Sequence, residues 1–257
     1  MTEDDRASGA VTPQPRDSSG HSVPYVALGP RPAAIWAEIL LCSGYPTQIM
    51  VGGLLMAVGL APTGPDQSLS PRFVFALSLL DTVMLLTLIV ALLIRRGERP
   101  LDVFFGGRPA LAEAACGVLS VPFVLTVVLV LMAAVMRFAP QLHNVPNNPL
   151  ETLLRTPSGV WVFLFVAIVA GGVREELQRA FLLHRFTHDL GRRWQGLLIC
   201  SIAFGLGHTL QGNDAAIITG ALGALWGSMY LIRGSALGPI VSHSLFNSAE
   251  LLKIVLR

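Results

Sequence analysis

Four charged residues follow a strongly apolar run in the middle of this chain. The run WVFLFVAIVA is typical of a membrane helix, and Arg174, Glu175, Glu176 and Arg179 come within two turns after it. An ionised side chain near the centre of a bilayer costs roughly 2.5–3.5 kcal/mol, so these charges need partners or a function. Glu175 precedes Arg179 by four residues, a favourable spacing for a helical ion pair. Taken alone, the four residues suit a self-neutralising structural cluster and a functional site equally well.

Polar residues also interrupt two later apolar segments. His208 ends the run IAFGLGH, and His243 and Asn247 stand one helical turn apart in VSHSLFN, on one face of a helix. A single histidine in an apolar helix is more often a packed, hydrogen-bonded residue than a ligand. Two such histidines, an asparagine in register and a glutamate pair on another helix form a more coherent set.

This set has the chemistry of a peptide-bond hydrolase. Two neutral imidazoles can hold zinc, with a carboxylate or water completing a tetrahedron, and zinc lowers the pKa of its bound water to about 7. A nearby carboxylate serves as general base, and an asparagine amide stabilises an oxyanion. His208 and His243 are the two histidines that we place deep in the membrane, so we expect them to bind zinc. Without a metal, glutamate and histidine can still activate water, and this alternative stays open.

The composition predicts an all-α, polytopic membrane helical bundle. Of the 257 residues, 53% are hydrophobic and 13% charged, against roughly 25% charged residues in a soluble domain. A net charge of +2 implies no broad basic surface for nucleic acid. Residues 1–32 are expected to be a disordered cytoplasmic tail and 33–257 a transmembrane domain. Seven membrane segments are expected, at about 39–60 (kinked at Pro46), 73–94, 110–136, 160–183, 196–210, 215–232 and 236–255.

The arginine distribution predicts a multi-pass plasma-membrane protein with its N-terminus in the cytoplasm. With that orientation, eleven Arg or Lys residues lie in the inner segments and five in the outer ones, as the positive-inside rule requires. We expect the site to open toward the cytoplasmic half. The outer loop contains NNPLETLLR, in which Asn148 can cap a short surface helix that begins at Pro149.

Three motifs resemble those of the CPBP intramembrane proteases, which include the type II CAAX prenyl endopeptidases and bacteriocin-processing or immunity proteins. That family is marked by EExxxR, FxxxH and HxxxN on separate membrane helices. Here the second motif is Phe204–His208 and the third is His243–Asn247. The resemblance covers a protease-like core of about 158–250. It implies that His208, His243 and Asn247 are site residues, that a glutamate of the first motif activates water, and that Arg179 and Phe204 support them.

The first motif departs from this pattern, because Arg179 follows the glutamate pair after two residues and not three. Aligned on Arg179, Arg174 occupies the family's first glutamate and Glu175 the second. Successive helical residues point about 100° apart, and Glu175 needs less rewinding than Glu176 to face the histidines. We therefore expect Glu175 to be the base, held ionised by Arg179, with Glu176 as the other catalytic candidate. Glu176 and Arg174 are then expected to serve charge balance or to hydrogen-bond the residues of the site.

The function expected is an intramembrane endopeptidase that cuts a membrane-anchored peptide, with prenylated CAAX tails suggested by one branch of the family. Two alternatives remain: a catalytically inactive relative that acts by binding, for example in bacteriocin immunity, and a small transporter that relays protons. Four further polar residues lie outside the motifs. His184 and His188 are expected near the inner interface, Glu250 is expected to pair with Lys253, and Asp81 is either a relay group or bonded to a neighbour.

Overall fold

The computed structural model describes residues 32–146, 148–154 and 157–256, and the expected tail lies outside these residues except for Pro32, which begins the first helix. The described residues form helices, with one isolated antiparallel bridge between Thr63 and Leu69 and no longer strand among them. This agrees with the all-α prediction.

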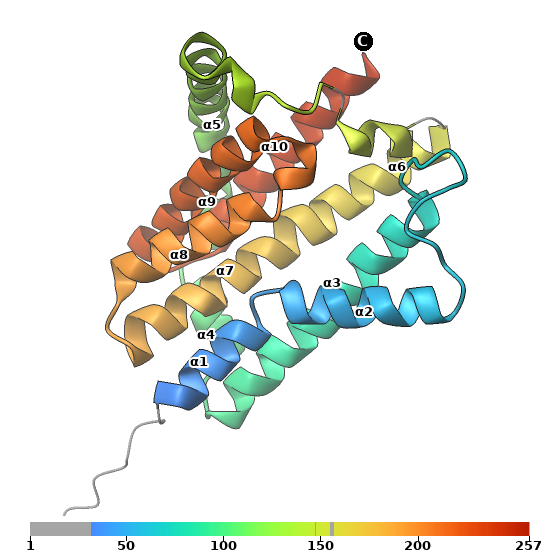
Figure 1. Cartoon of the computed structure of the whole chain (residues 1–257). Helices are drawn as coiled ribbons and strands as arrows, with labels where there is room; N and C mark the ends of the chain where they lie inside the picture. Colours follow the sequence, from blue (N-terminus) through green and yellow to red (C-terminus); the bar gives the residue numbers. More distant parts are fainter. Residues whose placement is uncertain (1–31, 147, 155–156, 257) are drawn as a thin grey trace, which may run out of the picture. The chain divides into compact units, whose positions relative to one another are not determined.

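The chain runs back and forth through a helical bundle (Figure 1). The α-helices are α1 (Pro32–Leu41), α2 (Tyr45–Ala57), α3 (Pro71–Arg95), α4 (Pro100–Phe105), α5 (Ala110–Phe138), α6 (Pro157–Val166), α7 (Glu175–His184), α8 (Arg193–Leu206), α9 (Asn213–Arg233) and α10 (Leu237–Val255). Two π-helices, η3 (Ala167–Arg174) and η4 (Arg185–Asp189), continue α6 and α7, and short 3-10 turns are η1 (Pro140–Leu142), η2 (Pro149–Leu154) and η5 (Thr209–Gln211).

All seven expected segments are helical, but the count of seven membrane spans is not confirmed. Within the described residues, α3, α5 and α9 are each long and apolar enough to cross a membrane. If the bent pair α1–α2 is counted as one further span, the number rises to four. The bend of 44° falls between Leu41 and Tyr45, where Gly44 adopts a left-handed φ of 90°. We expected Pro46 to kink a helix. It stands instead in the first turn of α2, so this expectation was wrong.

The connecting segments lie at two opposite ends of the bundle. We call the end that contains residues 95–109, 184–195 and 233–236 the arginine-rich end. The other end contains residues 58–70, 139–146 and 207–212, and we call it the α6 end because α6 begins there. At the α6 end, Pro149 begins η2 as expected, and the Asn148 side chain accepts a hydrogen bond from the backbone N–H of Leu150. The helix formed there is a 3-10 turn.

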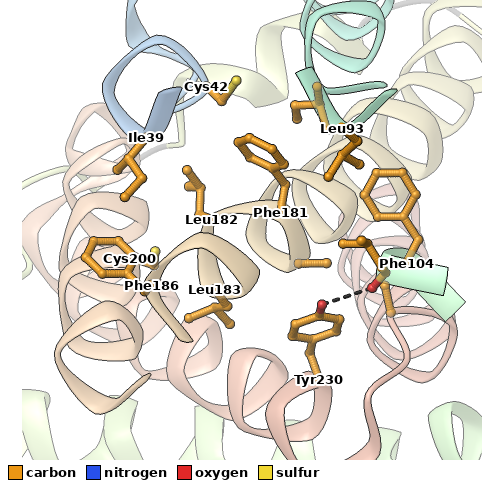
Figure 2. Packing of buried hydrophobic residues seen from close by; sticks show 14 of the residues in the cluster. Ile39, Cys42, Leu93, Phe104, Phe181, Leu182, Leu183, Phe186, Cys200 and Tyr230 are labelled. Atoms are coloured by element: carbon orange, nitrogen blue, oxygen red, sulfur yellow. Dashed lines mark hydrogen bonds between the residues drawn. The ribbon is translucent and has the colours of Figure 1, made fainter. Parts of the chain in front are cut away.

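A tightly packed apolar core fills the arginine-rich half of the bundle (Figure 2). It joins α1, the second half of α3, α4 and α7. Tyr230 of α9 closes one side, and its hydroxyl donates to the carbonyl of Val103 over 2.9 Å. The fully or nearly fully buried members are Ile35, Ile39, Cys42, Leu85, Ile89, Leu93, Val103, Phe104, Ala180, Phe181, Leu182, Leu183, Phe186, Cys200, Tyr230 and Ala236.

An ion cluster covers this core at the arginine-rich end. The side chain of Arg185 is fully buried, and its guanidinium donates to Glu38 over 2.9 Å and to Glu98 over 2.6 Å. His184 bonds Glu98 over 2.8 Å, and its ring lies 4.6 Å from that of His188. Burial alone would raise the pKa of the Glu98 carboxyl, but hydrogen bonds from His184 and Arg185 hold it below its usual value. His184 thus has a structural partner and lies away from the motif residues.

Two glycines bring α10 against η3. A Cβ at Gly172 would stand 2.0 Å from the Ser244 hydroxyl, and one at Gly171 would stand 2.6 Å from the Asn247 amide nitrogen. Small residues commonly permit such close helix contacts in membranes. The contact matters because α10 carries His243 and η3 leads directly into Glu175.

Adding a methyl group at this contact should loosen the bundle. We expect Gly172→Ala to lower the free energy of unfolding by about 1–3 kcal/mol, the usual cost of overpacking. Thermal unfolding of the purified protein in detergent measures it. Gly53→Ala is the matched control, because a Cβ there meets nothing within 4 Å and replaces a helical glycine favourably. Equal midpoints for the two variants would contradict the close contact.

Candidate active site

The motif residues line one cavity of about 670 Å³. Glu175, His208, His243 and Asn247 all contribute to its wall, together with apolar residues of α3, α5, α6 and α9. The structure therefore brings together four site residues from three separate segments of the sequence: α7, the end of α8, and α10. Glu176, the other expected catalytic residue, does not line the cavity.

Glu176 lies behind His243 and orients it. The Glu176 side chain is 1% exposed, and one of its carboxylate oxygens accepts hydrogen bonds from His243 Nδ1, over 2.8 Å, and from Arg179. A carboxylate accepts only, so the proton of a neutral His243 lies on Nδ1 and the lone pair on Nε2. The Arg179 charge compensates that of Glu176 in a place from which water is excluded.

Glu175 faces the cavity on the other side of the same imidazole. Its side chain is 20% exposed, and Oε2 lies 3.9 Å from His243 Nε2. That separation is too long for a direct hydrogen bond, and both atoms are acceptors. A water molecule that donates one hydrogen to each fits between them and would have its own lone pairs free for a substrate.

This arrangement corrects one expectation. Arg179 pairs with Glu176, three residues earlier, and not with Glu175. The physical reason is burial. Both the i,i+3 and the i,i+4 spacing suit a helical ion pair, but Glu176 is only 1% exposed and needs a counter-charge there, whereas Glu175 is 20% exposed at the wall of the cavity.

His208 reaches the cavity from the end of α8. Its Nδ1–H donates to the carbonyl of Phe204 over 2.8 Å, which leaves the lone pair of a neutral ring on Nε2. The Phe204 ring packs edge-on against both histidines, with its centroid 4.8 Å from that of His208 and 6.1 Å from that of His243. Arg179 packs its guanidinium over the same ring at 4.4 Å, so Phe204 and Arg179 support both sides of the site.

Asn247 holds the first part of η3. Its amide nitrogen donates to the carbonyl of Ala167 over 3.2 Å. An amide carries two N–H groups, and Asn247 also lines the cavity. The residue therefore has one donor engaged in structure and a second that can serve a reacting group.

Arg174 and Asp81 form a buried ion pair between η3 and α3. Their side chains are 8% and 2% exposed, and both line the cavity. Of the two roles expected for Asp81, the structure shows the bond to a neighbour. The charge of Arg174 is neutralised by this residue of α3, which is distant in sequence. It also ties the π-helix that precedes Glu175 to the neighbouring helix.

Sequence reasoning missed Trp226. Its ring stacks on His243, with centroids 3.9 Å apart and planes 16° apart, and its indole N–H donates to Ser242 over 3.0 Å. A tryptophan within an apolar helix resembles any core aromatic residue, so the sequence contained no signal for this role. Glu250 forms its expected pair with Lys253, at 3.3 Å.

The structure does not assemble a complete set of metal ligands. Within the described part of the chain, no group of three or more His, Cys, Asp or Glu side chains is placed so that it could hold a metal ion. His208 and His243 each direct a free Nε2 lone pair away from a hydrogen-bonded Nδ1, which is the donor chemistry that zinc prefers. The two histidines suit zinc chemically, whereas a third ligand is not in place.

Residues 156–249 match the family model described as type II CAAX prenyl endopeptidase Rce1-like. The match supports the resemblance to the CPBP family over this segment, which is less than half of the chain. No match to the chain was found among curated proteins or among solved structures. The matched residues include α6, α7, α8 and α9 and end at residue 249 within α10, so they contain Glu175, His208, His243 and Asn247.

The matched family is a protease family whose members act on membrane-associated substrates. The long apolar helices α3, α5 and α9 agree with a membrane protein.

Replacing one partner of the Arg174–Asp81 pair should lower the free energy of unfolding more than replacing both partners. We expect Asp81→Asn or Arg174→Gln to destabilise the protein by about 3–5 kcal/mol, because one buried charge is left alone. The double variant Asp81→Leu, Arg174→Leu should be more stable than either single variant. Thermal unfolding of the three proteins in one detergent measures this. Additive losses in the double variant would contradict the coupling.

Proposed function

We propose that this protein is an intramembrane endopeptidase that hydrolyses a peptide bond of a membrane-anchored substrate with water activated by Glu175. The observation that carries the proposal is the 3.9 Å separation between Glu175 Oε2 and His243 Nε2 at the wall of the cavity. Glu176 is buried and bonded on the far side of the imidazole. The two glutamates therefore have different surroundings and different roles.

The reaction proceeds by proton transfers through Glu175. Glu175 accepts a proton from the water while the water oxygen attacks the carbonyl carbon of the substrate, and the carbonyl oxygen becomes an oxyanion. The free N–H of Asn247 donates to that oxyanion. Glu175 then returns the proton to the amide nitrogen as the C–N bond breaks, giving a carboxylic acid and an amine. His243, held by Glu176 and Trp226, orients the water throughout.

We also propose that His208 and His243 bind a zinc ion. Bound there, zinc would lower the pKa of its water and polarise the substrate carbonyl. The proton transfers described above need only Glu175, His243 and Asn247. The donor chemistry of the two Nε2 atoms supports the metal, and the missing third ligand is the reason to test it separately.

Arg174 favours a second candidate function. When the first motif is aligned on Arg179, Arg174 stands where the family has its first glutamate. A catalytically inactive member that binds a membrane partner, as in bacteriocin immunity, is the function expected if Glu175 does not replace that glutamate. Activity on a membrane-anchored peptide separates the two candidates.

Substitution of the glutamates tests the assignment. Glu175→Gln is nearly isosteric and should lower kcat by about 10²–10⁴-fold, the usual contribution of a general base. Glu176→Gln weakens a charge-assisted hydrogen bond of about 1.5–3 kcal/mol and should lower kcat less, by roughly 10–100-fold. Cleavage of membrane-anchored peptides is measured, with Glu151→Gln at the rim of the cavity as control. An active Glu175→Gln beside a dead Glu176→Gln would reverse the assignment.

Metal analysis of the purified protein tests zinc without reference to activity. We expect about one zinc per chain in the wild type and none in the His208→Ala, His243→Ala double variant. His184→Ala and His188→Ala should retain it, because His184 bonds Glu98 at the arginine-rich end. Zinc retained by the double variant would exclude these ligands. A metal-free wild type that cleaves peptide would leave the mechanism through Glu175 and His243.

A further inference from the structure

The connector between α5 and α6 forms part of the wall of the cavity. Of its residues, His143, Val145 and Asn148 line the cavity. The cavity reaches the protein surface beside this connector, because the side chains of His143 and Lys253, which are 38% and 54% exposed, also line it. The position of the connector therefore helps to set the width of the opening.

Three side-chain hydrogen bonds hold the connector to residues 211–214, which lead into α9. We call these three bonds the latch. They join His143 Nδ1 to the Asp214 carboxylate over 2.6 Å, the Asn144 side-chain oxygen to the backbone N–H of Asn213 over 2.8 Å, and the Asn148 amide nitrogen to the Gln211 side-chain oxygen over 3.3 Å. Since no covalent bond joins the two segments here, the latch alone sets their distance at these points.

The α9 side of the latch is the fixed side. The Asp214 side chain is 4% exposed and lies in the first turn of α9, where the helix dipole favours a carboxylate. Gly212 has a φ of 122°, which glycine adopts without strain, and a Cβ there would stand 2.5 Å from Asp214 Oδ1 and 3.5 Å from the Cβ of Val145. The two segments thus meet closely at a preformed surface, from which the more exposed His143 can separate.

The latch differs in kind from the contacts that hold the helical walls of the cavity. The wall formed by α10 and η3 has no room for a methyl group at Gly172, and the buried Arg174–Asp81 pair ties η3 to α3. Moving those helices would unpack the bundle. In the latch, His143 and Asn144 are exposed, so their hydrogen bonds can be exchanged for bonds to water at little net cost.

We propose that residues 143–146 and 148 form a gate, which leaves the latch to admit a peptide to Glu175. This inference rests on the proposed function, because a cavity of about 670 Å³ has the volume of a small-molecule site, whereas an anchored peptide continues on both sides of its scissile bond. Leu153 of η2 is 2% exposed and anchors the connector before α6. The gate therefore opens while α5 and α6 stay in place, as short active-site loops do.

Thiol labelling tests the gate without reference to cleavage. In full-length protein whose native cysteines Cys42, Cys116 and Cys200 are replaced by Ala, the probe is Thr219→Cys in the cavity wall. A maleimide that carries a bulky polyethylene glycol chain should modify this cysteine about tenfold faster in the His143→Ala, Asn144→Ala double variant, with Asn144→Ala alone intermediate. Glu151→Gln, which lies in η2 outside the latch, is the matched control and should keep the parent rate. Equal rates in all four proteins would overturn the proposal.

Locking the latch tests its role in cleavage. In the same background, Asn148→Cys and Gln211→Cys replace a pair whose side-chain atoms lie 3.3 Å apart, within reach of a short, reducible bis-methanethiosulfonate. Cross-linking should lower cleavage of a membrane-anchored peptide by about tenfold or more, and reduction should restore it, whereas each single-cysteine protein should cleave equally before and after the treatment. Undiminished cleavage by the cross-linked protein would overturn the proposal. If the wild type cleaves no peptide, the proposed endopeptidase fails, while the labelling rates still decide whether the gate exists.

Discussion

The structure depends on the neutralisation of charge inside an apolar bundle. Glu176, Arg179 and His243 form one buried network, and Arg174 and Asp81 form another. Each ionised group would be costly at that depth without its partner. Because the partners lie on α3, α7, α10 and η3, the helices that carry them cannot slide or rotate independently. The charges that serve chemistry thereby also set the packing of the bundle.

This constraint explains why one glutamate reaches the cavity and its neighbour does not. Glu176 uses one carboxylate oxygen for both Arg179 and His243 and is sealed from the cavity. Glu175 has no such partners and keeps part of its surface in the cavity. The buried Glu176 carboxylate fixes Nδ1 of His243, and the accessible Glu175 carboxylate faces Nε2 of the same ring. The imidazole is therefore held in a preorganised position. The stacking of Trp226 on His243 adds a second support that does not involve charge.

The division of the bundle into a packed half and a hollow half follows from side-chain size and polarity. Leu, Ile and Phe residues of α1, α3, α4 and α7 meet at the arginine-rich end and exclude solvent. Toward the α6 end the corresponding positions carry smaller or polar residues, such as Ser78, Ala170 and Gly171, and a cavity remains.

Much of this protein could be predicted from its sequence. The apolar runs placed all seven helical segments, because helix formation there depends on local composition, and the FxxxH and HxxxN motifs placed three residues that meet at one cavity. Three features depended on tertiary structure. Arg179 pairs with Glu176 and not with Glu175 because Glu176 is buried whereas Glu175 reaches the cavity. Asp81 and Trp226 find their partners across the bundle. The position of the cavity depends on how side chains from several helices fill space together, which no local pattern in a single helix determines.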